Sequence, residues 1–176
     1  MHSILRNIIW ALFIISSGVI ERPVIADDLT AVETPQTNEE LVRRLFREGF
    51  SGGDLKVVEE IFSPDIELVD PNLPPGIEGI KAIVRKNNET FEDWAFELHD
   101  VLAVDDKVVV RWTGSGIHTK SFMQETPTNK RVSLNGLSIY QIRDGRIITD
   151  WVIPDNLQFL MQLGVIKPFG MTDSEN

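Results

Sequence analysis

Residues 138–151 read Ser138-Ile139-Tyr140-Gln141-Ile142-Arg143-Asp144-Gly145-Arg146-Ile147-Ile148-Thr149-Asp150-Trp151. An Asp-Gly pair separates two segments in which apolar and polar residues alternate, which is the strongest short-range signal of a β-hairpin. We therefore expect antiparallel strands at 132–143 and 146–153. The second strand carries an acid, Asp150, which a sheet could point into a cavity.

The segments on either side of this hairpin predict the rest of the fold. Alternation with a period of two continues upstream, whereas the first third of the chain shows helical spacing. The expected elements are helices capped by Asn38 and Asp54, a short strand at 66–69, a helix at 77–91, strands at 94–104 and 107–118, and a last helix that Asp155 caps and Gly164 ends, with Leu157, Leu160 and Met161 inward. Helices followed by long antiparallel strands indicate an α+β domain, with helices on one face of a curved sheet and a pocket between the layers.

The first 26 residues have the features of a secretory signal peptide. Arg6 precedes an apolar run at 8–20, and Val24-Ile25-Ala26 offers small residues for cleavage before Asp27. The alternative is an uncleaved anchor, but thirteen residues rise only about 20 Å as a helix, short of a hydrocarbon core of roughly 30 Å. We expect a secreted or periplasmic protein with a linker at 27–37, one domain at 38–165 and a flexible tail at 166–176.

The charge and the absence of cysteine exclude several classes of function. Without residues 1–26 the chain has 15 basic and 26 acidic residues, a net charge of −11 that repels nucleic acid and anionic lipid. A chain with no cysteine has no disulfide, thiolate nucleophile or zinc–thiolate site. His99 and His118 are the only histidines after the signal segment, so we expect no metal centre.

Several short motifs, taken in order, resemble the SnoaL-like polyketide cyclase (ester cyclase) family of the nuclear transport factor 2-like superfamily. They are Ser51-Gly52-Gly53-Asp54, Asp70-Pro71 with Pro75-Gly76 and Gly79, Arg111-Trp112-Thr113-Gly114, Gly116-Ile117-His118-Thr119, Pro127-Thr128, Ser138-Ile139-Tyr140, Asp144-Gly145-Arg146-Ile147, Trp151, Asp155 and Gln162-Leu163-Gly164. The resemblance spans residues 38–165. It implies a cone-shaped α+β barrel, a homodimer, one pocket for a small hydrophobic molecule, and no cofactor.

The resemblance also implies a reaction, an intramolecular aldol ring closure in which an acid of the last strand is the general acid/base. In this chain the position of that acid holds Val152, and the position of a histidine found in some cyclases holds Ser138. Asp150 lies two residues before Val152 and should share its sheet face. We expect Asp150 as the catalytic base, with its pKa raised by an apolar pocket.

Other candidates are weighed against purely structural roles. His118 or Tyr140 would polarise a substrate oxygen, although His118 could instead be an exposed loop residue. The further candidate ligand-binding residues are Trp112, Ser138, Asn87, Val152 and Asp70. Trp112 and Trp94 could simply pack in the core, and Asp70 could serve only to fix its loop.

Three functions remain open from the sequence. One is a cyclase, isomerase or hydratase that moves protons on a small apolar carbonyl compound. The second is a non-catalytic module that binds a hydrophobic ligand or presents its sheet to a partner. The third is a structural dimer whose interior is filled by its own side chains.

Overall fold

The computed structural model describes residues 37–68 and 73–167. The elements in chain order are α1 (Asn38–Arg44), the π-helix η1 (Leu45–Ser51), α2 (Leu55–Ile61), β1 (Phe62–Glu67), α3 (Ile77–Thr90), β2 (Phe91–Val104), β3 (Lys107–His118), β4 (Arg131–Arg143), β5 (Arg146–Pro154) and α4 (Asn156–Leu163). Helices come first and the long strands follow, so the predicted α+β class is confirmed. The predicted signal segment, residues 1–26, and Asp70 lie outside the described residues.

The strands form one five-stranded sheet, in the order β1-β5-β4-β3-β2. Only β1 and β5 run parallel; the other neighbours are antiparallel. The predicted hairpin is β4–β5, in which Arg143 pairs with Arg146. Asp144 and Gly145 both have positive φ, at 51° and 71°, as a two-residue hairpin turn of the primed type requires.

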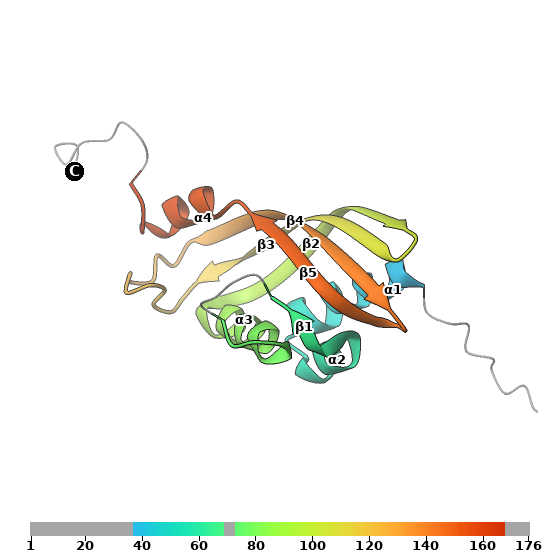
Figure 1. Ribbon diagram of the computed structural model, residues 1–176. Helices are drawn as coiled ribbons and strands as arrows, with labels where there is room; N and C mark the ends of the chain where they lie inside the picture. The colour runs from blue at the N-terminus through green and yellow to red at the C-terminus, as the bar shows by residue number, and fades with distance from the viewer. Residues whose placement is uncertain (1–36, 69–72, 168–176) are drawn as a thin grey trace, which may run out of the picture. The chain divides into compact units, whose positions relative to one another are not determined.

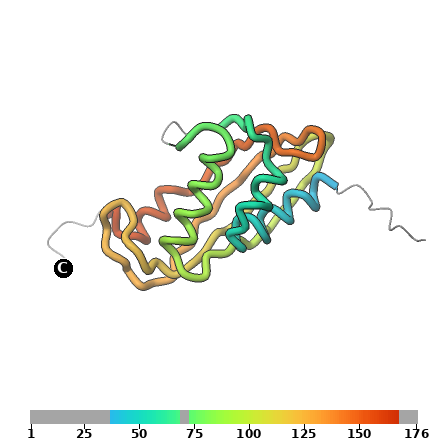
Figure 2. The backbone as a smooth tube through the Cα atoms, turned by 90° about the horizontal axis from the view of Figure 1, so that it is seen from below, coloured from blue at the N-terminus to red at the C-terminus, as the bar shows by residue number. Residues whose placement is uncertain are grey.

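Helices α1, α2 and α3 and the π-helix cover one face of this sheet (Figures 1 and 2). The even-numbered residues of β3 and β4 point to that face, where Val108, Val110 and Tyr140 are buried against Val42 and Leu45 of the helices. This main core lies where the helices meet the strands. It leaves room beside α3, over the middle of the sheet.

A second, smaller cluster lies where α4 packs beside β4, at one end of the sheet (Figure 1). Phe159 and Leu163 are its buried α4 residues, whereas Leu157, predicted to face inward, is 45% exposed. The rotation of the helix is set by Gln162, whose carboxamide accepts a hydrogen bond from the backbone N–H of Ser133 (2.9 Å) and donates one to the backbone carbonyl of Ser133 (2.8 Å). The prediction of inward Leu157 was therefore wrong.

Two boundaries also differ from the prediction. Thr37, not Asn38, is the first N-cap, because Thr37 and Glu40 form a capping box in which each side chain accepts the other's backbone N–H. The short strand begins at Phe62, before Pro64, where a break was expected. A proline fits there because β1 is an edge strand, in which one N–H of each pair needs no sheet partner.

Within residues 37–68 and 73–167, none of the helices combines the length and apolar character needed to cross a membrane.

Candidate active site

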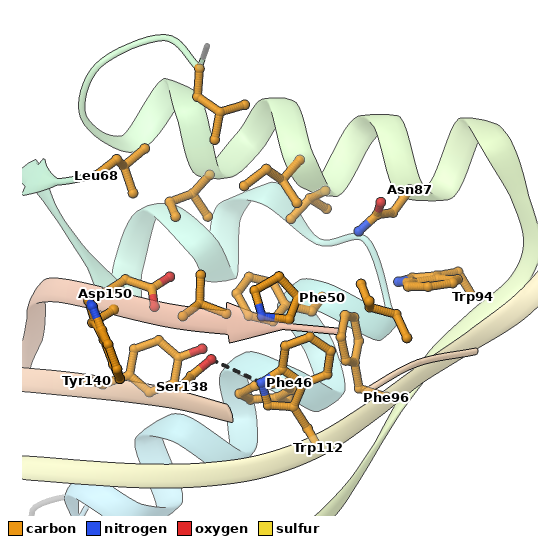
Figure 3. Close-up of a pocket in the computed structure, with 18 of the residues that line it drawn as sticks. Phe46, Phe50, Leu68, Asn87, Trp94, Phe96, Trp112, Ser138, Tyr140 and Asp150 are labelled. Carbon is orange, nitrogen blue, oxygen red and sulfur yellow. Dashed lines mark hydrogen bonds between the residues drawn. The ribbon is translucent and has the colours of Figure 1, made fainter. Parts of the chain in front are cut away.

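A cavity of about 520 Å³ lies between α3 and the sheet (Figure 3). Its wall is mostly aliphatic and aromatic, and its residues are Phe46, Phe50, Leu68, Leu73, Ile80, Ile83, Val84, Asn87, Trp94, Phe96, Trp112, Leu134, Ser138, Tyr140, Asp150, Trp151, Val152, Pro154 and Asn156. The size is that of a typical small-molecule site. The interior is thus hollow, which contradicts the expectation of a dimer whose pocket is filled by its own side chains.

Among the described residues of this wall, Asp150 is the only one with an ionisable acidic or basic group other than the Tyr140 phenol. It lies in β5 directly opposite Tyr140 of β4, on the face that the helices cover. Its Oδ1 atom is shielded from solvent and has no hydrogen-bond partner. Burial, which penalises the charged form, raises the pKa of this carboxyl to about 7.

The hydroxyl of Tyr140 lies beside this carboxyl, in a chain of polar groups on β3 and β4. The Trp112 indole Nε1–H donates to the Ser138 hydroxyl over 3.0 Å (Figure 3), and the Ser138 hydroxyl lies close to that of Tyr140. Burial raises the pKa of Tyr140 well above its usual value, the Asp150 charge adds to this, and the bond to Ser138 opposes it. Tyr140 therefore remains a protonated donor next to an acid that ionises near neutral pH.

Gly136 makes this chain of groups possible. It pairs with Trp112 across the β3–β4 ladder, and a Cβ atom at position 136 would overlap the indole ring. Without a side chain there, the ring lies over the strand and its Nε1 reaches Ser138, two residues along β4. A larger residue would push the indole off the sheet and open that hydrogen bond.

The structure brings most of the predicted ligand-binding residues to the cavity. Trp112, Ser138, Tyr140, Asn87 and Val152 all line it, together with Asp150. Val152 pairs with Ser138, so the two positions that the family resemblance singled out do face each other across the hairpin. Asp70 lies outside the described residues.

His118 is the exception. Its side chain is completely buried, but it packs against Phe91 in the second cluster, with 5.6 Å between ring centroids, and is not part of the cavity wall. Its Nδ1 accepts the backbone N–H of Thr128 over 3.2 Å. The imidazole holds the loop after β3, and the structure does not support the predicted role of His118 beside Asp150.

The aromatic part of the wall was not recognised from the sequence. Phe46, Phe50 and Phe96 pack edge-to-face or tilted, with ring centroids 5.2 to 5.8 Å apart, and separate the Asp150 end from the Trp94 end (Figure 3). In the sequence, Phe46 lies in a segment with helical spacing and Phe96 in a segment that alternates with a period of two. Neither pattern distinguishes a side chain that lines a hollow from one that fills a core.

The described part of the wall contains no lysine, arginine or histidine, and it offers hydroxyl, indole, carboxamide and carboxyl groups. No group of three or more metal-ligating side chains occurs within the described residues. Such a site can hold an uncharged, mostly apolar molecule, donate hydrogen bonds to its oxygens, and accept a proton at Asp150.

Comparisons with known proteins agree with this architecture. Residues 40–163 match the profile of the SnoaL-like polyketide cyclases, and no curated protein gives a significant match. The structure of TsrD from Streptomyces laurentii is similar, with a TM-score of 0.67, 28% identity, and coverage of 72% of this chain and 94% of TsrD. A candidate polyketide cyclase from Acidithiobacillus ferrooxidans has a TM-score of 0.63 and 25% identity, over 72% of this chain and 93% of its own.

The candidate polyketide cyclase IdmH from Streptomyces antibioticus is 32% identical, with a TM-score of 0.62, over 71% of this chain and 96% of IdmH. The family profile covers more than two thirds of the sequence, and the structural matches extend over nearly the full length of each relative. The fold, the cavity and these matches lead to one assignment: the chain belongs to the SnoaL-like polyketide cyclase family, with the nuclear transport factor 2-like fold.

Proposed function

We propose that this protein catalyses proton transfer at an acidic carbon of a small, uncharged carbonyl compound, using side chains alone. The observation that carries the proposal is the Oδ1 atom of Asp150, buried without a hydrogen-bond partner in an apolar cavity. A carboxylate left unpaired in such a place costs stability, and natural sites tolerate that cost where the group acts on a ligand. A pKa of about 7 also suits a general base at neutral pH.

The chemistry begins with Asp150 in its ionised form. Oδ1 takes a proton from the carbon next to a carbonyl group, and the electron pair of that C–H bond moves onto the carbonyl oxygen. Tyr140, whose raised pKa keeps it protonated, donates its O–H to the negative charge that develops there. Donors placed where charge develops are worth most in a site that excludes water.

The resulting enolate has two routes that return the proton. In an isomerase, Asp150 delivers it to a different carbon of the same molecule. In a cyclase, the enolate carbon bonds to a second carbonyl carbon of the substrate, and the new alkoxide receives the proton from Asp150. The family assignment favours the second route, and each leaves Asp150 ionised for the next turnover.

The experiment measures hydrogen–deuterium exchange at the acidic carbon of a bicyclic β-keto ester, the methyl ester of tetralone carboxylic acid. The purified protein in D2O should accelerate this exchange, and Asp150→Asn should lower the catalysed rate by about 10²- to 10⁴-fold. Asp100→Asn is the matched control, since Asp100 is exposed and pairs with Arg111 at 2.6 Å, away from the cavity.

The same measurement separates catalysis from plain binding. A non-catalytic module is the second candidate, favoured by Val152 at the position where the family resemblance expects an acid. Such a module would bind the ester, as seen by calorimetry, without accelerating exchange. Undiminished exchange in Asp150→Asn would remove Asp150 from the mechanism.

A further inference from the structure

A second buried polar atom without a partner lies in the cavity wall, far from Asp150. Among the described residues, the buried side-chain atoms with no hydrogen bond are Thr90 Oγ1, Trp94 Nε1, His118 Nε2 and Asp150 Oδ1. Only Trp94 and Asp150 belong to residues that line the cavity. One is a donor and the other an acceptor, and Figure 3 shows them at opposite ends of the site.

The Trp94 ring cannot easily turn to find a partner. It is 4% exposed and packs against Phe91 and Phe96, with centroid distances of 4.8 and 5.7 Å. It lies over Gly114, where a Cβ atom would come within 2.8 Å of the indole Cζ2. The direction of the Nε1–H bond is therefore fixed by packing, and leaving this donor unpaired is unfavourable in the free protein.

Asn87 provides a second neutral polar group at the same end. Its carboxamide lines the cavity close to the Trp94 indole nitrogen and forms no hydrogen bond with the described residues (Figure 3). The neighbouring carboxamide behaves differently, because Asn88 donates to the Val84 carbonyl over 2.9 Å. Nε1 is shielded from solvent, and the Asn87 side chain beside it has no hydrogen bond to break if it turns toward a ligand oxygen.

The separation of the two ends sets the shape of a ligand that reaches both. Trp94 lies over Gly114, which pairs with Leu134, whereas Asp150 pairs with Tyr140. Leu134 and Tyr140 are six residues apart on β4, so they share one face of the strand and the two ends of the cavity are well separated. With an apolar middle made by three phenylalanines, the cavity suits an elongated fused-ring molecule.

We propose that Trp94 Nε1 and the Asn87 carboxamide form a second polar subsite, which binds a neutral acceptor oxygen, a carbonyl or hydroxyl, at the end of the substrate remote from its acidic carbon. This inference rests on the proposed function, because it places the acidic carbon at Asp150. A carboxylate or phosphate is disfavoured, since no cationic side chain is among the described residues of the wall and Asp150 is an acid. A ligand that uses both ends is thus uncharged and carries a hydrogen-bond acceptor at the end remote from its acidic carbon.

The test uses two linear tricyclic β-keto esters that differ only on the distal ring. One carries an acetyl group and the other an isopropenyl group, which has the same shape without the oxygen. Calorimetry should show that the wild-type protein binds the acetyl compound about tenfold more tightly, the equivalent of one buried hydrogen bond. Trp94→Phe and Asn87→Leu should each reduce this preference to about twofold or less, whereas Asn88→Leu should keep it.

The circular dichroism of each variant confirms folding, and the ratio between the two compounds cancels general losses of affinity. Equal binding of both compounds by the wild-type protein would overturn the subsite, as would a preference that survives both substitutions. Exchange at the acidic carbon is measured on the same samples. Exchange without an acetyl preference refutes the subsite alone, whereas an acetyl preference lost in Trp94→Phe but without exchange refutes the proposed catalysis and leaves the subsite standing.

Discussion

Replacement of Asp150 by asparagine should make the protein more stable, and increasingly so as the pH rises. The pKa of this carboxyl rises from 3.8 in its ordinary state to about 7 in the folded protein because of burial. Below the lower value the acid is protonated in both states, and burial of its charge costs nothing. Between the two values the unfolded chain ionises while the folded protein does not, so the wild type loses stability until about pH 7.

The size of the effect follows from proton linkage. With these two pKa values, burial of the Asp150 carboxyl lowers the free energy of unfolding by about 2 kcal/mol at pH 5 and about 4 kcal/mol at pH 8. The stability difference between Asp150→Asn and the wild type should therefore grow by up to about 2–3 kcal/mol between these pH values. Because part of the side chain meets water in the cavity, about 1 kcal/mol is the lower end of the expected range.

Urea unfolding at pH 5, 6, 7 and 8 measures this difference directly. Subtracting wild type from variant at each pH removes the contribution of the other titrating groups, and comparing these differences between pH values removes the pH-independent effect of the new amide. Asp100→Asn should show no such growth, since Asp100 is exposed and lies outside the cavity. A stability difference that stays constant within about 0.5 kcal/mol, or that shrinks toward pH 8, would refute the buried, unpaired state of Asp150.

Two further substitutions test the scaffold of the site. Gly136→Ala should lower the free energy of unfolding by about 1–3 kcal/mol, because the new Cβ overlaps the Trp112 ring; an unchanged urea midpoint would contradict the packing described here. His118→Leu should lower stability by about 1–3 kcal/mol through loss of the acceptor for the Thr128 N–H, and the β-keto ester exchange rate should stay at the wild-type level. Loss of exchange in a folded His118→Leu protein would restore His118 to the mechanism.

Local signals sufficed for most of the fold. The Asp144-Gly145 turn, the cap at Asp54 and the left-handed Gly164 at the end of α4 each depend on a few neighbouring residues, and the structure has them as predicted. The errors arose where distant contacts decide. Gln162 bonds to β4 and rotates α4 away from the expected orientation, and the parallel pairing with β5 draws Phe62 into a strand.

In the candidate site, too, the sequence pattern predicts which face a side chain lies on, whereas contacts between distant segments decide what surrounds it. Alternation along β3 correctly places His118 on the same face as Trp112, but it says nothing about what lies above each position. Six residues separate the two along the strand, enough to move His118 out of the cavity and under the second cluster. Whether Phe46 or Trp94 fills a core or lines a cavity likewise depends on the position of α3 above the sheet. That position is set by tertiary packing and cannot be read from the local sequence pattern.

The register of the hairpin explains how this chain can lack the acid that the family resemblance expects and still place a carboxylate in the cavity. The expected acid and histidine positions hold Val152 and Ser138, which pair with each other; Asp150 and Tyr140 are the next pair on the same face. Because side chains alternate with a period of two, a shift of two residues on both strands keeps the polar pair facing inward and moves it by about 7 Å. A one-residue shift would have turned both groups to the opposite face. Asp150 and Tyr140 thus place an acid and a hydroxyl one inward-facing pair along the hairpin, and Val152 and Ser138 remain part of the cavity wall.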